Sequence, residues 1–547
     1  MKHFKESPLS IALDLQDNEL GSFYQSLSID DRLFVKGLIS HFPREVQEVL
    51  IEQYQSFEKP FNANTYLRQT SEKIDAILPE KLRNYFGSGE DDLREAAEEN
   101  AQRCKRIELY VVKSKAGNSL TDSDSVNGIS DVYAACAKLV NGFGINPPEE
   151  SNVVTLTGAI RRMQDKYWWL RKLRKVLTQK RENVFIALGQ VNSRKGKYCS
   201  DFTVKFRQLQ IERQRKMLEN LVIVNEEDDS FSLAELSDKN VSNPVNRKNE
   251  LMTRMAGFEQ ISKDLGHKAL FVTITCPSRF HNTYAKSGDR NPKWDGSTPY
   301  DGQQYLNSMW SRIRAEFDRQ GITQYGFRVA EPQHDGTPHW HMLIFIEPHH
   351  MDAYKQVVIE HALRDDGDEA GATENRCDFK EIDYSRGSAT GYIAKYVSKN
   401  INGKNLDSDI DGGDATHAAQ RVNAWASCWS IRQFQQIGKG SVTVWRELRR
   451  LRQVQHFAEG LKKIHTAADN GSWSEFVTLM GGVFSKRDEQ AVRPLYLEKV
   501  DETTGEIKQS YFDGVITHAL KGVRYGEQEI ITRVHEWRIE HSSERAA

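Results

Sequence analysis

The sequence predicts an α+β fold for its central part, with an antiparallel sheet that packs against helices on one face. Between residues 250 and 400, short apolar segments alternate with longer segments of helical periodicity. Two of the apolar segments flank a turn that contains Asp335-Gly336, which is a hairpin signal. The resulting order, β-α-β-β-α-β-α, suits an antiparallel sheet with helices packed on it. We expect mainly helical regions on both sides of this core.

The chain of 547 residues is longer than one ordinary domain. We expect a mainly helical region at 1–150 without a chemical motif, and a basic, aromatic helical region at 151–250. The second region ends in a polar segment from Glu226 that reads as a linker or an exposed loop. The alternating patterns fill residues 251–405, and 406–547 read as a helical or mixed region.

The elements of the core follow from local patterns. The strand that begins at Lys268 is rich in β-branched residues and ends before Pro277. Helical spacing of large apolar residues marks the first core helix. The expected elements are a strand at 268–275, a helix around 306–317, strands at 323–331 and 339–346, a helix at 351–363, a strand at 377–383 and a helix at 388–401. An acidic, Gly-rich loop follows from Asp407, and then a helical, aromatic and basic region at 429–452.

The composition is that of a soluble globular protein: 38% hydrophobic, 28% charged and a net charge of −2. A nucleic-acid partner would therefore need locally concentrated positive charge. No window approaches about 18 consecutive apolar residues, and the N-terminus lacks a secretory signal, so we expect no membrane partner. Six scattered cysteines without Cys-x-x-Cys pairs argue against a zinc ribbon or a disulfide framework and favour a reducing cytoplasm.

Two histidines, His339 and His341, lie one residue apart in an apolar strand. Side chains alternate between the faces of a strand, so both imidazoles point the same way, together with Leu343 and Phe345. Such a pair can bind one divalent ion. It can equally be two structural histidines, each with its own hydrogen bond.

A carboxylate upstream favours the metal site. Glu331 ends the preceding strand, and the turn would fold it back beside His339 and His341, which gives an open site with three ligands. A cation bound there would act as a Lewis acid. Mixed nitrogen and oxygen ligands suit Mn²⁺, Zn²⁺ or Mg²⁺. His334 and Asp335 are also near, but they lie in the turn, so we favour them less as ligands.

Tyr392 and Tyr396 are spaced i and i+4, which places both phenols on one face of a helix. Two tyrosines at this spacing often pack into a core. Beside a metal site they are also candidate nucleophiles, because Lys395 or the cation can favour the phenolate, whose ordinary pKa is about 10. Attack on a phosphodiester would give a covalent phosphotyrosine and release a sugar hydroxyl.

Basic and aromatic residues are interleaved in the segment RRMQDKYWWLRKLRKVLTQKRE. This pattern suits phosphate contact and base stacking on single-stranded DNA, or simply a solvated helix face. The candidate DNA-binding residues are Lys399, Trp168, Trp169, Arg171, Lys172, Arg174 and Lys175.

The segments FVTITCPSRFH, EPQHDGTPHWHMLIF and GYIAKYVSK resemble, in this order, the three motifs of the HUH endonucleases that start rolling-circle replication. The tyrosine pair resembles the two-tyrosine branch, and the most similar family is that of the replication gene A proteins of bacteriophages and prophages. WWLRKLRK and IRQFQQIGKGSVTVWRELRRL are also similar to that family, so the resemblance covers roughly residues 160–455.

The resemblance implies an HUH nuclease core at 251–405 and an origin-specific nickase that depends on Mg²⁺ or Mn²⁺. The enzyme would stay attached to the 5′ end, leave a free 3′ hydroxyl for host DNA polymerase, and later rejoin the displaced strand. His339, His341 and Glu331 correspond to metal ligands, Tyr392 and Tyr396 to nucleophiles, and Lys395 to a helper near the scissile phosphate. Residues 151–250 and the first part of 406–547 would contact DNA.

The sequence lacks the GxxxxGK[ST] phosphate loop, so we expect a host helicase to unwind the duplex. The expected location is the cytoplasm of a bacterial host. Two alternatives remain: a relaxase- or transposase-like enzyme with the same chemistry, and a DNA-binding initiator without catalytic activity.

Overall fold

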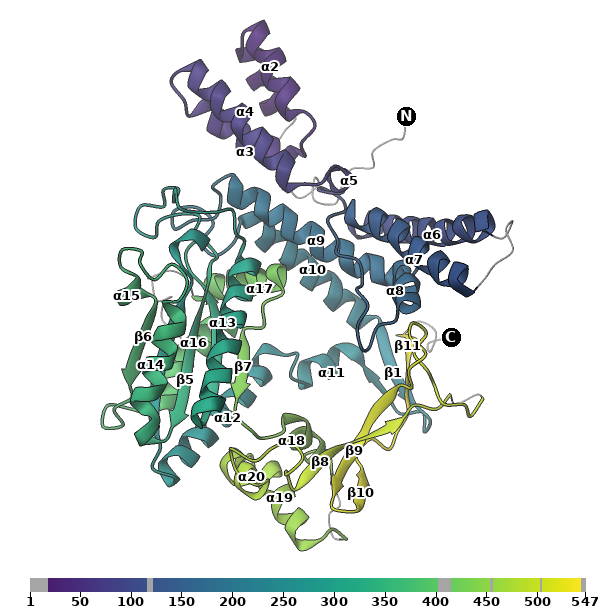
Figure 1. Ribbon diagram of the computed structural model, residues 1–547, viewed down its shortest axis with the longest axis vertical. Coiled ribbons are helices and arrows are strands. Elements are labelled where there is room, and N and C mark those ends of the chain that lie inside the picture. The colour runs from purple at the N-terminus through teal and green to yellow at the C-terminus, as the bar shows by residue number, and fades with distance from the viewer. Residues whose placement is uncertain (1–17, 116–121, 402–414, 453–455, 502–503, 543–547) are drawn as a thin grey trace. The chain divides into compact units, whose positions relative to one another are not determined.

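The computed structural model describes residues 18–115, 122–401, 415–452, 456–501 and 504–542 (Figure 1). The acidic, Gly-rich loop expected from Asp407 lies outside these residues. The chain forms two compact units. The first comprises Met1–Gln190 with Val500–Thr517, and the second comprises Val191–Lys499 with His518–Ala547.

The first unit is built from helices, as predicted for the N-terminal region. Hydroxyl and carboxylate side chains cap several of them. Thr155 accepts a hydrogen bond at the start of α8, and Asp165 does so at the start of α9. The helices of this unit are α1 (Asn18–Ser26), α2 (Ile29–Ile39), α3 (Arg44–Gln55), α4 (Pro60–Ile77), α5 (Glu80–Arg83), α6 (Glu90–Lys115), α7 (Asp122–Asn141), α8 (Leu156–Met163) and α9 (Lys166–Ala187).

The second unit contains a five-stranded antiparallel sheet. The expected order of strands and helices is confirmed, and the strand order is β6-β3-β5-β4-β7. Its strands are β3 (Lys268–Thr275), β4 (Gln324–Pro332), β5 (Pro338–Ile346), β6 (Cys377–Glu381) and β7 (Phe434–Ile437). Four of them lie within residues 251–405, whereas β7 comes from a segment that was predicted to be helical.

The predicted hairpin joins β4 to β5. Gln333 N donates to Thr337 O at 2.8 Å, and Gly336 N donates to Gln333 O at 2.9 Å. Gly336 has a φ of 84°, and a Cβ at this position would lie 2.8 Å from the carbonyl oxygen of Tyr198. Both the backbone conformation and the close approach therefore require glycine.

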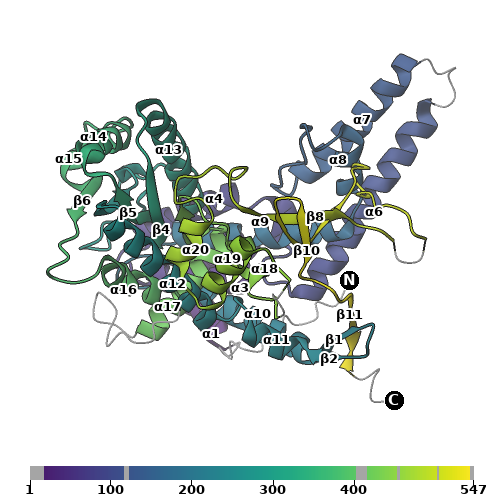
Figure 2. The ribbon, with the colours of Figure 1, turned by 90° about the horizontal axis from the view of Figure 1, so that it is seen from below.

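Helices cover both faces of the sheet, so the prediction of one covered face is wrong. On one face, Trp340 of β5 packs against Trp310 of α13 (Pro299–Gln320), with ring centroids 6.4 Å apart. On the other face, Phe327 of β4 packs against Phe258 of α12 (Pro244–Asp264), with centroids 5.5 Å apart. Figure 2 shows α13 and α14 (Met351–Ala362) on one side and α12, α16 (Ala389–Ile401) and α17 (Ala415–Trp429) on the other.

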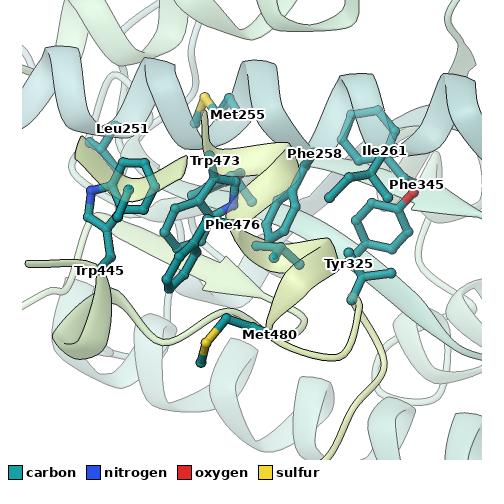
Figure 3. Packing of buried hydrophobic residues seen from close by; sticks show 14 of the residues in the cluster. Leu251, Met255, Phe258, Ile261, Tyr325, Phe345, Trp445, Trp473, Phe476 and Met480 are labelled. Atoms are coloured by element: carbon teal, nitrogen blue, oxygen red, sulfur yellow. The ribbon is translucent and has the colours of Figure 1, made fainter. Parts of the chain in front are cut away.

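The main apolar core lies between α12 and the sheet. Phe258 contacts Tyr325 of β4 and Trp473 of α20 (Trp473–Leu479), with centroids 5.4 and 6.1 Å apart (Figure 3). The same cluster includes Ile393 and Tyr396 of α16. Packing therefore fixes α16 against the sheet face that carries the two histidines.

The rest of the second unit departs from the sequence predictions. The segment from Glu226, predicted to be a linker or an exposed loop, forms β2 and α11. The C-terminal region is not mainly helical, because it contributes to a sheet of order β10-β9-β8 and to a second of order β11-β1-β2. The remaining elements are α10 (Asp201–Glu219), β1 (Leu221–Asn225), β2 (Ser230–Ser232), α11 (Leu233–Lys239), α15 (Ala372–Asn375), α18 (Val442–Leu448), α19 (Glu459–Asp469), α20 (Trp473–Leu479), β8 (Val492–Glu498), β9 (His518–Tyr525), β10 (Gln528–Ile531) and β11 (Trp537–His541).

The six cysteines are free, and Cys377 alone among them is not buried. Within the described part of the chain, no helix combines the length and the apolar character that a membrane crossing requires.

Candidate active site

The three predicted metal ligands meet on one face of the sheet. Glu331 lies directly opposite His339 in the register of β4 and β5, and His341 follows on the same face. The Nε2 atoms of His339 and His341 are 2.8 Å apart, and His341 Nε2 is 3.9 Å from Glu331 Oε2. The hairpin therefore brings together residues that the sequence separates by a turn.

Neighbouring side chains orient two of these groups. Thr273, which is paired with His341 in the register of β3 and β5, places its Oγ1 3.0 Å from His341 Nδ1. Asn400 of α16 donates to Glu331 Oε1 and also to the carbonyl oxygen of Tyr396, at 2.6 Å. These contacts fix the imidazole and the carboxylate before any ligand arrives.

Both imidazoles are held neutral. Burial, together with the nearby Lys399 ammonium, lowers the pKa of His339 to about 3. Burial and then the His339 ring lower the pKa of His341 well below its ordinary value. Neutral imidazole is the form that binds a metal ion.

The cluster fits a divalent cation. Two ligand atoms that bind one ion at about 2.1 Å lie about 3 to 4 Å apart, depending on the angle between the bonds. The measured separations of 2.8 and 3.9 Å fall near this range. Two imidazole nitrogens and one carboxylate leave further positions for water or a phosphate oxygen, which suits Mg²⁺ or Mn²⁺.

The two candidate nucleophiles lie beside this cluster. The ring of Tyr396 is 4.4 Å from the ring of His341, and the ring of Tyr392 is 6.4 Å from that of Tyr396. The start of α16 is tied to α12, because Thr390 N donates to Glu259 at 2.8 Å. The phenols are thus carried by a helix whose position both the core and this hydrogen bond define.

The two tyrosines differ in environment. Tyr396 is 9% exposed, and burial, followed by the phenol of Tyr392 and the charge of Glu331, raises its pKa. Lys395 is exposed and holds its Nζ 4.9 Å from each of the two ring centroids, whereas Lys380 lies 4.8 Å from the Tyr392 ring. Two ammonium groups therefore face the more accessible phenol.

Lys399 lies inside the site and not on an exposed DNA-binding surface. It is 6% exposed, its Nζ is 3.8 Å from Glu331 Oε2, and it lies 5.3 Å from the ring of Tyr198. The predicted contact of Lys399 with DNA stays a prediction, and the burial confines it to the site. The charge of Lys399 acts within the ligand cluster.

The predicted DNA-contacting residues of α9 divide into two groups. Trp168 and Trp169 are 5% and 0% exposed, so the prediction that they stack on bases is wrong. Trp169 Nε1 donates to Met163 O at 2.7 Å. Arg174 pairs with Glu90, Lys172 covers the Trp168 ring at 5.6 Å, and Arg171 and Lys175 are exposed.

Sequence reasoning missed Asn400 and did not assign Thr273 or Phe271. Phe271 stacks on His341 and on Tyr396, with centroids 5.4 and 5.2 Å apart. Alternation along a strand places Phe271 and Thr273 on one face, and Asn400 lies four residues after Tyr396. These spacings are the features of the sequence that could have indicated that the three residues lie near the histidines and the tyrosines.

Comparison with known proteins identifies similar sequences. Residues 91–404 match the family model described as bacteriophage replication gene A protein. The chain is 39% identical over 417 residues to the replication gene A protein of Escherichia phage 186, which covers 73% of this chain and 59% of that protein. It is 39% identical over 357 residues to the probable replication protein P12 of Pseudoalteromonas phage PM2, covering 64% and 55%. It is 30% identical over 503 residues to a probable replication endonuclease from a prophage-like region of Escherichia coli O6:H1, covering 84% and 62%.

Each of these matches spans less than two thirds of the relative's own length. The matched region begins at residue 91, earlier than the motif resemblance near residue 160, and so includes part of the N-terminal helical region. No solved structure matches the chain.

Proposed function

This chain belongs to the bacteriophage replication gene A protein family, and from that premise we propose that it is an origin-specific single-strand DNA endonuclease that initiates rolling-circle replication. One observation carries the proposal: two phenols on α16 lie beside a cluster of two neutral imidazoles and a carboxylate. The name replication endonuclease, given to a relative, agrees with the reaction class.

The reaction exchanges one phosphodiester for another. The phenolic oxygen of a tyrosine attacks the phosphorus and forms a bond to the 5′ side of the strand, while the bond to the 3′ oxygen breaks. The phenol loses its proton, and the departing 3′ oxygen takes up a proton. Because no water is consumed, the phosphotyrosine bond replaces the broken phosphodiester bond without hydrolysis, so the strand can be rejoined later. The second tyrosine can repeat the attack when the displaced strand is rejoined.

The side chains have separate roles. His339, His341 and Glu331 would hold a Mg²⁺ or Mn²⁺ ion, which when bound supplies Lewis-acid chemistry at the phosphate. Lys395 lies 4.9 Å from each ring and stabilises the phenolate and the negative phosphate. Asn400 and Thr273 keep Glu331 and His341 in place.

The test uses labelled single-stranded DNA from the replication origin with Mg²⁺ or Mn²⁺, and detects an adduct that survives SDS. We expect an adduct with the intact chain and none with the Tyr392→Phe, Tyr396→Phe double variant or with His341→Ala. Tyr496→Phe is the matched control, because Tyr496 lies on β8 and is 49% exposed. Binding without any adduct would refute the endonuclease and favour a DNA-binding initiator.

Two partners follow from the same proposal. The free 3′ hydroxyl would prime a host DNA polymerase, and a host helicase would supply unwinding. A purified chain that unwinds a duplex with ATP would contradict the need for a helicase.

A further inference from the structure

A pocket of about 400 Å³, lined mostly by polar residues, lies at the end of β3, next to the histidine cluster. Thr275 lines it, and Thr275 lies opposite His339 in the register of β3 and β5. Thr273, which contacts His341, shares a face with Thr275 because the two are separated by one residue. The pocket therefore begins where the ligand-bearing face of the sheet ends.

The wall of the pocket carries a buried polar group that lacks a partner. Thr283 is 6% exposed, and its hydroxyl has no hydrogen-bond partner among the described residues. Its backbone is fixed, since Thr283 forms a bridge with Arg290 and its carbonyl oxygen is 2.9 Å from His334 Nε2. A buried hydroxyl is costly to leave unpaired, so it is a natural contact for a polar ligand atom.

The chemistry of the lining indicates a nucleobase more than a bare phosphate. Lys293 and His281 offer donors, whereas Glu369 offers a carboxylate, 3.9 Å from Lys293 Nζ. A phosphate site would present donors alone, but the edge of a base presents both donors and acceptors. Tyr284, at 47% exposure, adds an aromatic ring on which a base can stack. The volume lies in the range of small-ligand pockets, about 300–1,000 Å³.

We propose that this pocket receives one unstacked base of the single-stranded origin, adjacent to the linkage that is cut, and sets the base preference at that position. The proposal rests on the proposed function, which supplies the DNA strand. Its recognition chemistry is independent of the cutting step, so the two are separable by experiment.

The experiment is a binding selection from a random single-stranded DNA library with Mg²⁺, using the full chain with Tyr392→Phe and Tyr396→Phe. In this background we compare no further change, Thr283→Val and Tyr284→Ala. Thr283→Val removes a hydroxyl that makes no hydrogen bond within the part of the chain that the structure describes, and Tyr284 is exposed, so both changes should leave the fold intact. Tyr496→Ala is the matched control, because its side chain is similarly exposed, at 49%.

We expect that the parent, which carries only the two tyrosine changes, enriches a particular base at one position of the DNA. Each pocket variant should lose the base preference at that position and keep the preferences at all other positions. An abasic site at that position should weaken binding roughly tenfold or more in the parent and Tyr496→Ala, and much less in Tyr284→Ala. Equal profiles for parent and pocket variants, or no base preference in the parent, would overturn the proposal.

The active chain separates the two hypotheses. If it forms no adduct with the selected DNA while the preference maps to the pocket, the endonuclease fails and the pocket stands. If the active chain forms adducts, and its base preference is unchanged by Thr283→Val and by Tyr284→Ala, the endonuclease proposal stands and the pocket proposal fails.

Discussion

Replacing Thr273 with valine should weaken metal binding without disturbing the sheet. Thr273 Oγ1 is 3.0 Å from His341 Nδ1. When His341 binds the metal through Nε2, its Nδ1 carries the proton and donates a hydrogen bond to the Thr273 hydroxyl. Valine keeps the branched shape and suits a β-strand, so the change removes the hydrogen bond and little else.

The magnitude follows from two limits. A neutral hydrogen bond contributes about 1 kcal/mol net, which corresponds to about a fivefold change in Kd. Loss of a partner that orients a metal-bound histidine costs about 10- to 100-fold in metal affinity. His341 is buried, so a misoriented ring has little freedom to find another partner. We therefore expect Mn²⁺ to bind about tenfold more weakly.

The assay is a titration with Mn²⁺, in which the electron paramagnetic resonance signal of the free ion is measured. Thr275→Val is the matched control: Thr275 lies on the same strand and face, but its hydroxyl donates to Asn375 O at 2.9 Å and not to a histidine. We expect its Kd to stay within about twofold of the wild type. An unchanged Kd for Thr273→Val, or equal losses in both variants, would refute the assigned role of the hydroxyl.

Three further predictions address the turn, the carboxylate and α9. Burial opposes ionisation of Asp335, but His281, His334 and the backbone N–H of Thr337 together outweigh it and lower the pKa to about 2; the charge therefore stabilises the fold by about 2 kcal/mol above about pH 4, and this is lost as the pH falls toward about 2. Asp335→Asn should lower the hydrogen-exchange protection of the β4–β5 hairpin at pH 7, and the difference should narrow at pH 3; a constant difference would contradict this linkage. Asn400→Ala should reduce Mn²⁺ affinity about tenfold, because Glu331 loses its orienting donor; an unchanged titration would exclude that role. Trp169→Phe should destabilise the first unit by about 1–3 kcal/mol in urea unfolding, yet leave affinity for single-stranded DNA unchanged; a large loss of affinity would restore the stacking hypothesis.

Local periodicity predicted much of the central sheet and of the ligand cluster. Alternation placed His339 and His341 on one face, and a two-strand hairpin placed Glu331 beside them. Helical spacing paired Tyr392 with Tyr396. Each of these relations spans a few residues and one element or turn, so the chain encodes it locally.

Two wrong predictions had contrary signals in the sequence. The strand HWHMLIFI is apolar at both alternating positions after the histidines, as expected of a strand buried on both faces. Trp169, Leu173 and Leu177 are spaced by four residues, which places Trp169 on the buried stripe of α9, whereas Arg171 and Lys175 form the exposed one. In both cases the spacing of the apolar residues indicates the burial more reliably than the amino-acid composition of the segment does.

Other features had no local signal. β7 pairs with β4 across about a hundred residues, and β1 pairs with β11 across more than three hundred. A short strand of this kind is stabilised by a partner that is distant in the sequence, so its own residues read as a loop or as part of a helix.

The separation between the ligand cluster and the phenols is the property on which the proposed chemistry depends, and it is set by packing. The rings of His341 and Tyr396 touch directly, with centroids 4.4 Å apart, and Phe271 packs beside both of them, 5.4 Å from His341, 5.2 Å from Tyr396 and 4.7 Å from Tyr392. A shorter side chain would leave a cavity beside these rings, and a polar one would leave an unpaired group in the core. An aromatic residue on β3 therefore supports both His341 and the two candidate nucleophiles, although it carries no reactive group itself.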